Sequence, residues 1–221
     1  MSGDLAAVLF DMDGLLVDSE PLWTVAEIEL AGRLGGTWDP GLKTAIVGTR
    51  LEVAVPTILR WYGRDAAEDE VAETSRWLLG RMGELLTERV PLLPGAADLL
   101  AAVRAAGIPV ALVSSSYRAL VDAVLASGVG PFDLTVAGDE VTDGKPHPAP
   151  YLLACARLGV EPQQCVVLED SPSGVAAGEA AGCAVVAVPS VPGVSFDDAP
   201  RRLVASGLRD VTLDALRALV A

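Results

Sequence analysis

Histidine and lysine are scarce in this chain of 221 residues. It contains a single histidine, His147, and only two lysines, Lys43 and Lys145. One histidine excludes a metal site built from several imidazoles, and it excludes a serine-histidine-aspartate triad that uses any histidine other than His147. Because the formal net charge is −14, each lysine is conspicuous as a candidate for binding an anion.

Cysteines and long apolar runs are also limited. The three cysteines, Cys155, Cys165 and Cys183, form no C-x-x-C pair and lie among apolar residues. This pattern predicts buried free thiols in a reducing compartment. The longest uncharged run, 180–196, contains two prolines, and the first apolar run is too short for a secretory signal. We therefore expect a cytoplasmic protein without a membrane span.

The acidic composition disfavours two classes of partner. The chain has 30 Asp and Glu against 16 Lys and Arg, so nucleic acid and anionic membrane surfaces would be repelled. Neither is expected as a partner. A small phosphate ester is still compatible with this charge if a local cation offsets the field.

Apolar runs that alternate with helix-length segments indicate an α/β fold. The first run, Ala6–Phe10, has no polar residue, as expected for a strand buried on both faces of a parallel sheet. Further strands are predicted at 108–113, 132–137, 164–169 and 184–188. Helices are predicted at 95–106, 117–125, 151–158, 173–181 and within 210–220. This alternation predicts a Rossmann-like parallel sheet with helices on both faces.

A second domain is predicted inside the first. After the opening strand, apolar residues recur at spacings of three and four, which is typical of helices. All four tryptophans fall in this segment, so we expect a helical insertion with its own aromatic core. The predicted α/β core domain comprises residues 1–17 and 91–221, and the predicted helical cap domain comprises residues 18–90.

Polar side chains follow the predicted strands. Asp11 and Asp13 come after the first strand, Ser114 after the second, and Glu169-Asp170 at the end of the fourth, with Lys145 in a loop before it. Because the carboxyl ends of parallel strands meet at one edge of a sheet, these residues are expected to converge. Carboxylates, a hydroxyl group and an ammonium group are what phosphoryl transfer requires.

Four motifs in this order resemble the haloacid dehalogenase superfamily. They are DMDGLLVDSEPLW (11–23), VSSS (113–116), GKPHPAPY (144–151) and LEDSPSG (168–174). They look most like the group of β-phosphoglucomutase and the sugar-phosphate phosphatases, whose members carry a helical cap after the first motif. The resemblance implies a Mg²⁺-dependent phosphatase that hydrolyses a small phosphorylated metabolite, a sugar or polyol phosphate, through an aspartyl phosphate. We expect a monomer.

The acidic residues can be given roles on chemical grounds. Asp11 is the expected nucleophile, and Asp13 the acid that protonates the leaving oxygen and then the base that deprotonates water. Neighbouring carboxylates and burial would help Asp13 to keep its proton near neutral pH. Asp11, Glu169 and Asp170 suit Mg²⁺, and the resemblance implies that Asp13 adds its backbone carbonyl. Whether Glu169 binds the metal directly or through water is left open.

The remaining polar residues are expected to bind the phosphoryl group. Lys145 would pair with Asp11 and with phosphoryl oxygens. Ser114 would donate its hydroxyl group to a phosphate oxygen, and the backbone N–H of Ser115 would help to complete the cradle. Ser116 is instead expected to cap the helix that follows.

Substrate choice is assigned to the cap. Arg50 is a candidate for binding a distal phosphate or sugar hydroxyl, although a solvated helix-end role fits it equally. Trp23 stands where the β-phosphoglucomutase pattern has a histidine, and the form SEPLW resembles the hexose- and hexitol-phosphate phosphatases. Three alternatives are kept: a phosphosugar mutase, a phosphonate hydrolase with Lys43 as Schiff base, and a phosphate-binding module without turnover.

Overall fold

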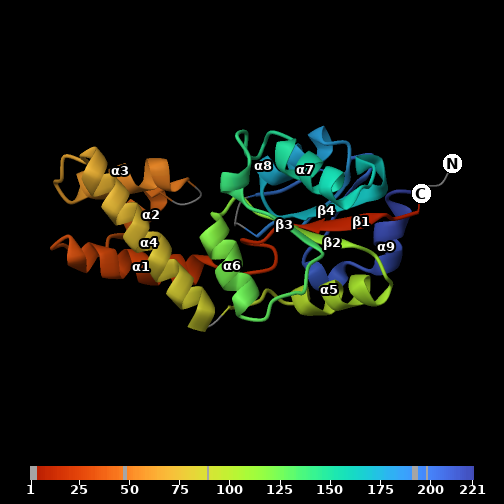
Figure 1. The fold of residues 1–221 in the computed structure, drawn as a ribbon, viewed down its shortest axis with the longest axis horizontal. Helices are drawn as coiled ribbons and strands as arrows, with labels where there is room; N and C mark the ends of the chain where they lie inside the picture. The colour runs from red at the N-terminus through yellow and green to blue at the C-terminus, as the bar shows by residue number, and fades with distance from the viewer. Residues whose placement is uncertain (1–3, 47–48, 89, 191–193, 198) are drawn as a thin grey trace. The chain divides into compact units, whose positions relative to one another are not determined.

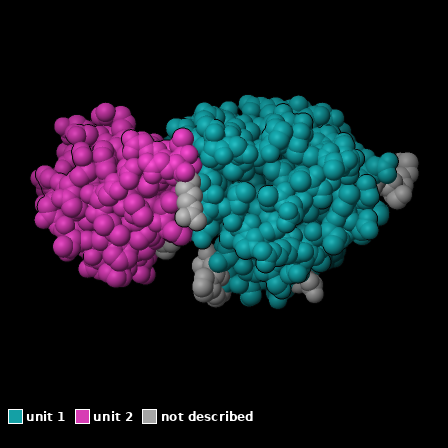
Figure 2. Space-filling model, turned by 90° about the horizontal axis from the view of Figure 1, so that it is seen from below, with its two compact units in different colours: residues 1–18, 90–221 teal, residues 19–89 magenta. Residues whose placement is uncertain are grey.

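The chain forms two compact units (Figure 1, Figure 2). The computed structural model describes residues 4–46, 49–88, 90–190, 194–197 and 199–221. Unit 1 comprises Met1–Asp18 and Val90–Ala221, and unit 2, the insertion, comprises Ser19–Arg89. The chain enters the insertion soon after its first strand and returns before the second.

Unit 1 is built on a six-stranded parallel sheet in the order β3-β2-β1-β4-β5-β6. The strands are β1 (Ala7–Phe10), β2 (Val110–Val113), β3 (Leu134–Val136), β4 (Cys165–Glu169), β5 (Ala184–Ala187) and β6 (Arg202–Val204). The predicted parallel sheet is thus confirmed. Phe10 at the end of β1 is in register with Leu112 on one side and Leu168 on the other. The residues that follow β1, β2 and β4 therefore meet at one edge.

Helices cover both faces of the sheet, as the sequence predicts. In Figure 1, α7 (Ala149–Leu158) and α8 (Pro172–Ala180) lie on one face, and α5 (Ala96–Ala105) and α9 (Leu213–Ala218) on the other. A further helix, α6 (Arg118–Ala126), follows β2. The sequence does not predict β6, because a half-buried three-residue edge strand has too few residues to show periodicity. In the described ranges, no helix is both long and apolar enough to cross a membrane.

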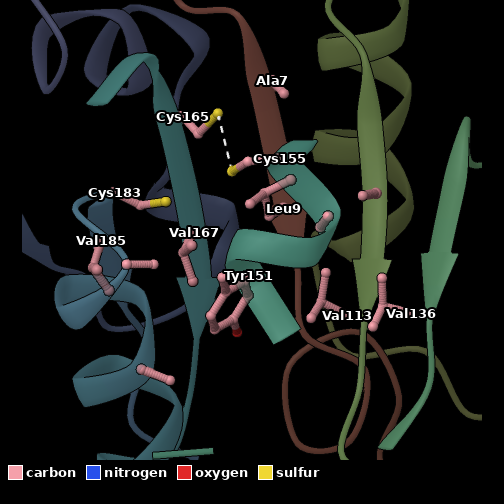
Figure 3. Close-up of a cluster of buried hydrophobic side chains, with 14 of the residues drawn as sticks. Ala7, Leu9, Val113, Val136, Tyr151, Cys155, Cys165, Val167, Cys183 and Val185 are labelled. Carbon is pink, nitrogen blue, oxygen red and sulfur yellow. Dashed lines mark hydrogen bonds between the residues drawn. The ribbon is translucent and has the colours of Figure 1, made fainter. Parts of the chain in front are cut away.

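A buried cluster packs α7 against the sheet (Figure 3). Leu9, Val167 and Val185 reach it from three strands. The three cysteines also lie there, buried and free, as predicted. Tyr151, on α7, is completely buried and lies nearer the carboxyl ends of the strands than Cys155 does. Its hydroxyl group can therefore reach the edge where polar residues gather.

The insertion consists of four helices in its described part, α1 (Glu20–Arg33), α2 (Pro40–Ile46), α3 (Leu51–Trp61) and α4 (Glu68–Glu88). The predicted aromatic core is wrong, because none of its tryptophans is buried and Trp61 is 46% exposed. The core is aliphatic instead. On α4, Leu78, Met82 and Leu86 repeat every four residues and face inward. Trp77 is one position out of phase with them and lies at the edge of the core.

Candidate active site

Asp11 lies at the rim of the sheet because it directly follows β1. Its backbone N–H donates to the carbonyl of Leu168 at 3.0 Å, which continues the pairing with β4. Its side chain is buried. Gly14, three residues on, has a φ of +82°, and a Cβ atom there would collide with the Asp170 carboxylate. Glycine at this position therefore turns the chain and leaves room for the acidic residues.

Lys145 connects the ends of three strands. Its Nζ donates to Oδ1 of Asp11 at 2.5 Å, to Oε1 of Glu169 at 2.7 Å and to the carbonyl of Val113 at 2.9 Å. These acceptors use all three N–H donors of the ammonium group. The Lys145 side chain is only 3% exposed, so water screens these contacts little.

Three carboxylates gather around this lysine. Oxygen atoms of Asp11, Glu169 and Asp170 all lie within 4.8 Å of one another, and all three residues are buried. One ammonium group cannot balance three carboxylates, so the site lacks positive charge. Oxygen donors in this arrangement fit a hard divalent cation such as Mg²⁺. The Asp13 carboxylate is not part of the group among the described residues, and its backbone carbonyl remains a predicted ligand.

Glu169 is held by more donors than the sequence suggests. Its Oε1 accepts from Lys145 and from the hydroxyl group of Tyr151 at 3.0 Å. Its Oε2 accepts from the backbone N–H groups of Asp170 and Ser171 and from the Ser171 hydroxyl group, at 2.9, 3.1 and 3.0 Å. Five donors leave this carboxylate little freedom to approach a metal directly. A water-bridged role for Glu169 is therefore favoured over direct ligation.

Sequence reasoning missed two residues that hold the acidic group. Tyr151 was predicted only as the first residue of a helix and the last of a motif, and Ser190 fell in no predicted strand, helix or motif. Ser190 Oγ donates to Oδ2 of Asp170 in a short hydrogen bond. The one available signal was that Tyr151 closes the GKPHPAPY motif, within two helical turns of Lys145.

Asp13 turns its side chain to the serines after β2. Its Oδ2 accepts from Ser116 Oγ at 2.7 Å and from Ser114 Oγ at 3.4 Å. Ser114 Oγ in turn accepts from the backbone N–H of Ser116 at 2.9 Å. The prediction that Ser116 caps the next helix is wrong. That helix begins at Arg118, with Tyr117 extended at its N-cap, so Ser116 is too far back to cap it.

The electrostatics reflect this crowding of acids. Burial raises the pKa of Asp11 well above its ordinary value, and neighbouring carboxylates add to the rise, whereas Lys145 opposes it. Burial also raises the pKa of Asp170, to about 6. For Glu169 burial acts in the same direction, but Lys145 and the other donors outweigh it and its pKa is lowered. A bound cation would favour the ionised form of the two raised groups.

The two remaining predicted site residues are Ser115 and Arg50. Ser115 follows Ser114 at the end of β2, with an exposed side chain. Arg50 belongs to the insertion, at the N-cap position of α3, and is exposed. The structure therefore brings Asp11, Asp13, Ser114, Lys145, Glu169 and Asp170 together in unit 1. Arg50 is in unit 2 and stays a predicted substrate-binding residue.

Comparison with known proteins agrees with this geometry. A family model described as haloacid dehalogenase-like hydrolase matches residues 5–182. Hexitol phosphatase B of Escherichia coli (strain K12) is 35% identical over 226 residues, covering 98% of this chain and 95% of its own. CbbY from Rhodobacter sphaeroides, solved in complex with phosphate, superposes with a TM-score of 0.83 at 31% identity, covering 96% and 99% of the two chains. β-Phosphoglucomutase from Clostridium difficile shares the fold, with a TM-score of 0.77 at 24% identity over 98% and 97%. The chain belongs to the haloacid dehalogenase-like hydrolase family.

Proposed function

We propose that this protein is a Mg²⁺-dependent phosphatase that hydrolyses a small sugar or polyol phosphate through an aspartyl-phosphate intermediate. One observation carries the proposal. Lys145 lies 2.5 Å from Asp11, in a site where Asp170 and Glu169 offer further carboxylate oxygens within 4.8 Å. A nucleophilic carboxylate, a fixed cation and a site for a divalent ion thus coincide at one strand edge.

Asp11 is the nucleophile in this proposal. Its carboxylate attacks phosphorus in line, the bond from phosphorus to the ester oxygen breaks, and the phosphoryl group is transferred to Asp11. Lys145 orients the attacking oxygen and offsets the negative charge on the phosphoryl group. Its position is fixed before substrate arrives, because Glu169 and the Val113 carbonyl hold the same ammonium group.

Asp13 supplies the proton transfers. It protonates the leaving alkoxide and then removes a proton from the water that hydrolyses the aspartyl phosphate. Ser116, at 2.7 Å, fixes the orientation of the Asp13 carboxyl group for both steps. Ser114 is placed to donate to a phosphate oxygen once substrate displaces its long contact with Asp13.

Asp11 and Asp170 would hold Mg²⁺, with Glu169 contributing through water. When bound, the ion neutralises phosphate charge and lowers the repulsion between substrate and the acidic site. That compensation is needed in a protein whose net charge is −14. The cytoplasmic location and monomeric state expected from the sequence belong to the same proposal.

A hexitol phosphate is the first substrate to test. One relative matched over nearly its full length is a hexitol phosphatase, and the SEPLW form of the first motif resembles the same group. We expect inorganic phosphate to be released from a hexitol 6-phosphate with Mg²⁺, and release to stop with EDTA. A panel of phosphorylated sugars, polyols and 2-carbon acids ranks the substrates. Release unaffected by EDTA would contradict a metal-dependent reaction.

The mutase alternative rests on the fold shared with β-phosphoglucomutase, and at 24% identity that likeness concerns the fold alone. A mutase must keep its phospho-enzyme from water and return the phosphoryl group to a sugar. It would need a sugar bisphosphate for activity and would release no inorganic phosphate, so the same assay separates the two. The insertion offers a mutase no spare lysine, because Lys43 is paired with Glu20 at 2.9 Å and Glu27 at 3.0 Å.

These contacts also disfavour a phosphonate hydrolase. A Schiff-base lysine must lose its proton to attack a carbonyl group. Burial lowers the pKa of Lys43, but Glu20 and Glu27 outweigh it and the pKa is raised overall. A phosphate-binding module without turnover is disfavoured because the proposed acid, Asp13, is held in place by two serines.

Replacing Asp13 by asparagine should slow the reaction according to the leaving group. Without the acid, a sugar alkoxide must leave unprotonated, whereas p-nitrophenolate leaves readily without a proton. We expect the loss in kcat/KM to be roughly 10²- to 10⁴-fold for a hexitol phosphate and clearly smaller for p-nitrophenyl phosphate. Equal losses on the two substrates would count against the acid role.

A further inference from the structure

We infer that the insertion carries a binding site for a free aliphatic α-amino acid, in a cavity between α1 and α4 that is separate from the proposed active site. The cavity measures about 450 Å³, within the range of small-molecule sites. All of its lining residues belong to unit 2: Leu30, Arg33, Leu34, Arg64, Glu70, Glu73, Thr74 and Trp77.

The cavity is lined by the C-terminal end of α1 and the N-terminal half of α4. Glu29 of α1 contacts Arg81 of α4, and one turn further Arg33 stacks on Trp77 at 4.8 Å. Beyond that point the two helices leave an opening. This opening lies about 20 Å along α1 from Glu20, and Glu20 is the residue near which the chain enters the insertion.

Thr74 shows that this opening is suited to a polar ligand. Its side chain is more than nine-tenths buried, and its hydroxyl group has no hydrogen-bond partner among the described residues. Every fully enclosed side-chain nitrogen or oxygen in the described ranges has a partner. The Thr74 hydroxyl group is therefore not fully enclosed, and Thr74 is one of the residues that line the cavity. A hydroxyl group in this position can donate to or accept from a ligand in the cavity.

One cation and one anion in the cavity are also available. Arg33 stacks on Trp77 but forms no ion pair within the described part of the chain, and Glu73 likewise has no cationic partner there. Arg64 and Glu70 differ, because they pair with each other at 3.4 Å. Stacking on the indole ring restricts the guanidinium group and so lowers the entropic cost of binding a carboxylate.

The loop that carries Arg64 has one unusual backbone conformation. Arg64 reaches the cavity from the loop between α3 and α4, and in that loop Ala66 has a φ of +54°. A residue with a Cβ atom rarely adopts this left-handed conformation, which must be held by its surroundings.

These groups select a zwitterion with an apolar tail. The ligand carboxylate would pair with Arg33, its ammonium group with Glu73, and its side chain would lie against Leu30 and Leu34. A net-neutral ligand also avoids the repulsion that a net charge of −14 imposes on anions. A free amino acid has both charges on one carbon, whereas a peptide terminus has only one of them.

Calorimetric titration of the full chain with L-leucine, L-valine and L-methionine tests the inference without reference to catalysis. We expect saturable binding of at least one of them. 3-Methylbutylamine and 4-methylpentanoate are leucine without its carboxylate and without its ammonium group. Each should bind at least about tenfold more weakly than leucine. No saturable heat from any of the three amino acids, or equal affinity for leucine and its two analogues, would overturn the inference.

Variants locate the site. Arg33→Gln and Glu73→Gln should each weaken amino-acid binding by about tenfold, and Thr74→Val by a few-fold. Arg76→Gln and Glu68→Gln remove the same charges from exposed positions of α4 outside the cavity, and should leave affinity unchanged. Undiminished binding by Arg33→Gln and Glu73→Gln would contradict the inference, and the leucine analogues decide it even if Thr74→Val fails to fold.

Discussion

Replacing Asp11 by asparagine should abolish phosphate release while the fold is retained. The amide cannot attack phosphorus to form an acyl phosphate, so the covalent route closes, and we expect a loss of roughly 10⁴-fold or more in kcat. Folding should survive because Lys145 keeps its contacts with Glu169 and the Val113 carbonyl. The measurement is phosphate release from the best substrate, with circular dichroism to check the fold.

Mass spectrometry of acid-quenched protein makes the result specific. During turnover the native chain should show a phosphorylated species, and the Asp11→Asn variant should show none. Asp98→Asn is the matched control, because Asp98 is exposed on α5, outside the site. It should behave like the native chain in both measurements. Continued turnover by Asp11→Asn would refute the covalent mechanism.

The sheet could be predicted from sequence because its central strands carry an unambiguous signal. β1, β2, β4 and β5 are short and buried along their whole length, and all are apolar except for Glu169 at the end of β4. The apolar composition of each strand does not reveal the order of the strands in the sheet. β1 lies between β2 and β4 although about a hundred residues or more separate it from either. Parallel pairing with helical crossovers narrows the possible strand orders, but the order itself was not predicted and comes from the structure.

The charged members of the site could be predicted because each follows a strand or stands in a recognisable motif. The residues that hold these charged groups in place could not be predicted. Tyr151 and Ser116 act through one hydroxyl group each, and a tyrosine in an apolar helix or a serine before a helix has an ordinary structural explanation. The structure shows that Tyr151 donates to Glu169 and Ser116 to Asp13.

The insertion shows the limit of composition as a guide. Four tryptophans in about seventy residues suggested an aromatic core, yet burial is decided by helical phase rather than by residue type. Leu78 and Met82 occupy the inward face of α4, and Trp77, one residue earlier, is directed elsewhere. The indole ring is then available to stack under Arg33.

Replacing Lys145 by methionine should cost both activity and stability. Methionine fills similar space but removes the charge that Asp11 and Glu169 share. Breaking a buried ion pair from one side typically costs about 3–5 kcal/mol, and loss of a fixed cation beside the transferred group should lower kcat by at least about 10²-fold. Chemical unfolding in EDTA, together with the phosphate assay in Mg²⁺, measures the two effects.

The control is the other lysine. Lys43 also lies between two carboxylates, Glu20 and Glu27, but in the insertion. Lys43→Met should destabilise the protein while lowering the turnover of folded enzyme far less than Lys145→Met does. Comparable losses of turnover in the two variants would mean that Lys145 acts only through stability.

The stability cost of Lys145→Met should grow with pH. Lys145 lowers the pKa values of Asp11 and Glu169 in the native protein, so its removal raises both. A carboxyl group whose pKa is raised by folding binds more protons in the folded than in the unfolded state. The contribution of such a group to the protein's free energy of unfolding therefore falls as pH rises from about 4, its pKa in the unfolded chain, through its higher pKa in the folded protein. The cost of the substitution should therefore be larger at pH 8 than at pH 5. In an Asp11→Asn background one of the two carboxylates is absent, so both the cost and its pH dependence should shrink. An equal cost at the two pH values would show that the lost side-chain packing, rather than uncompensated charge, destabilises the variant.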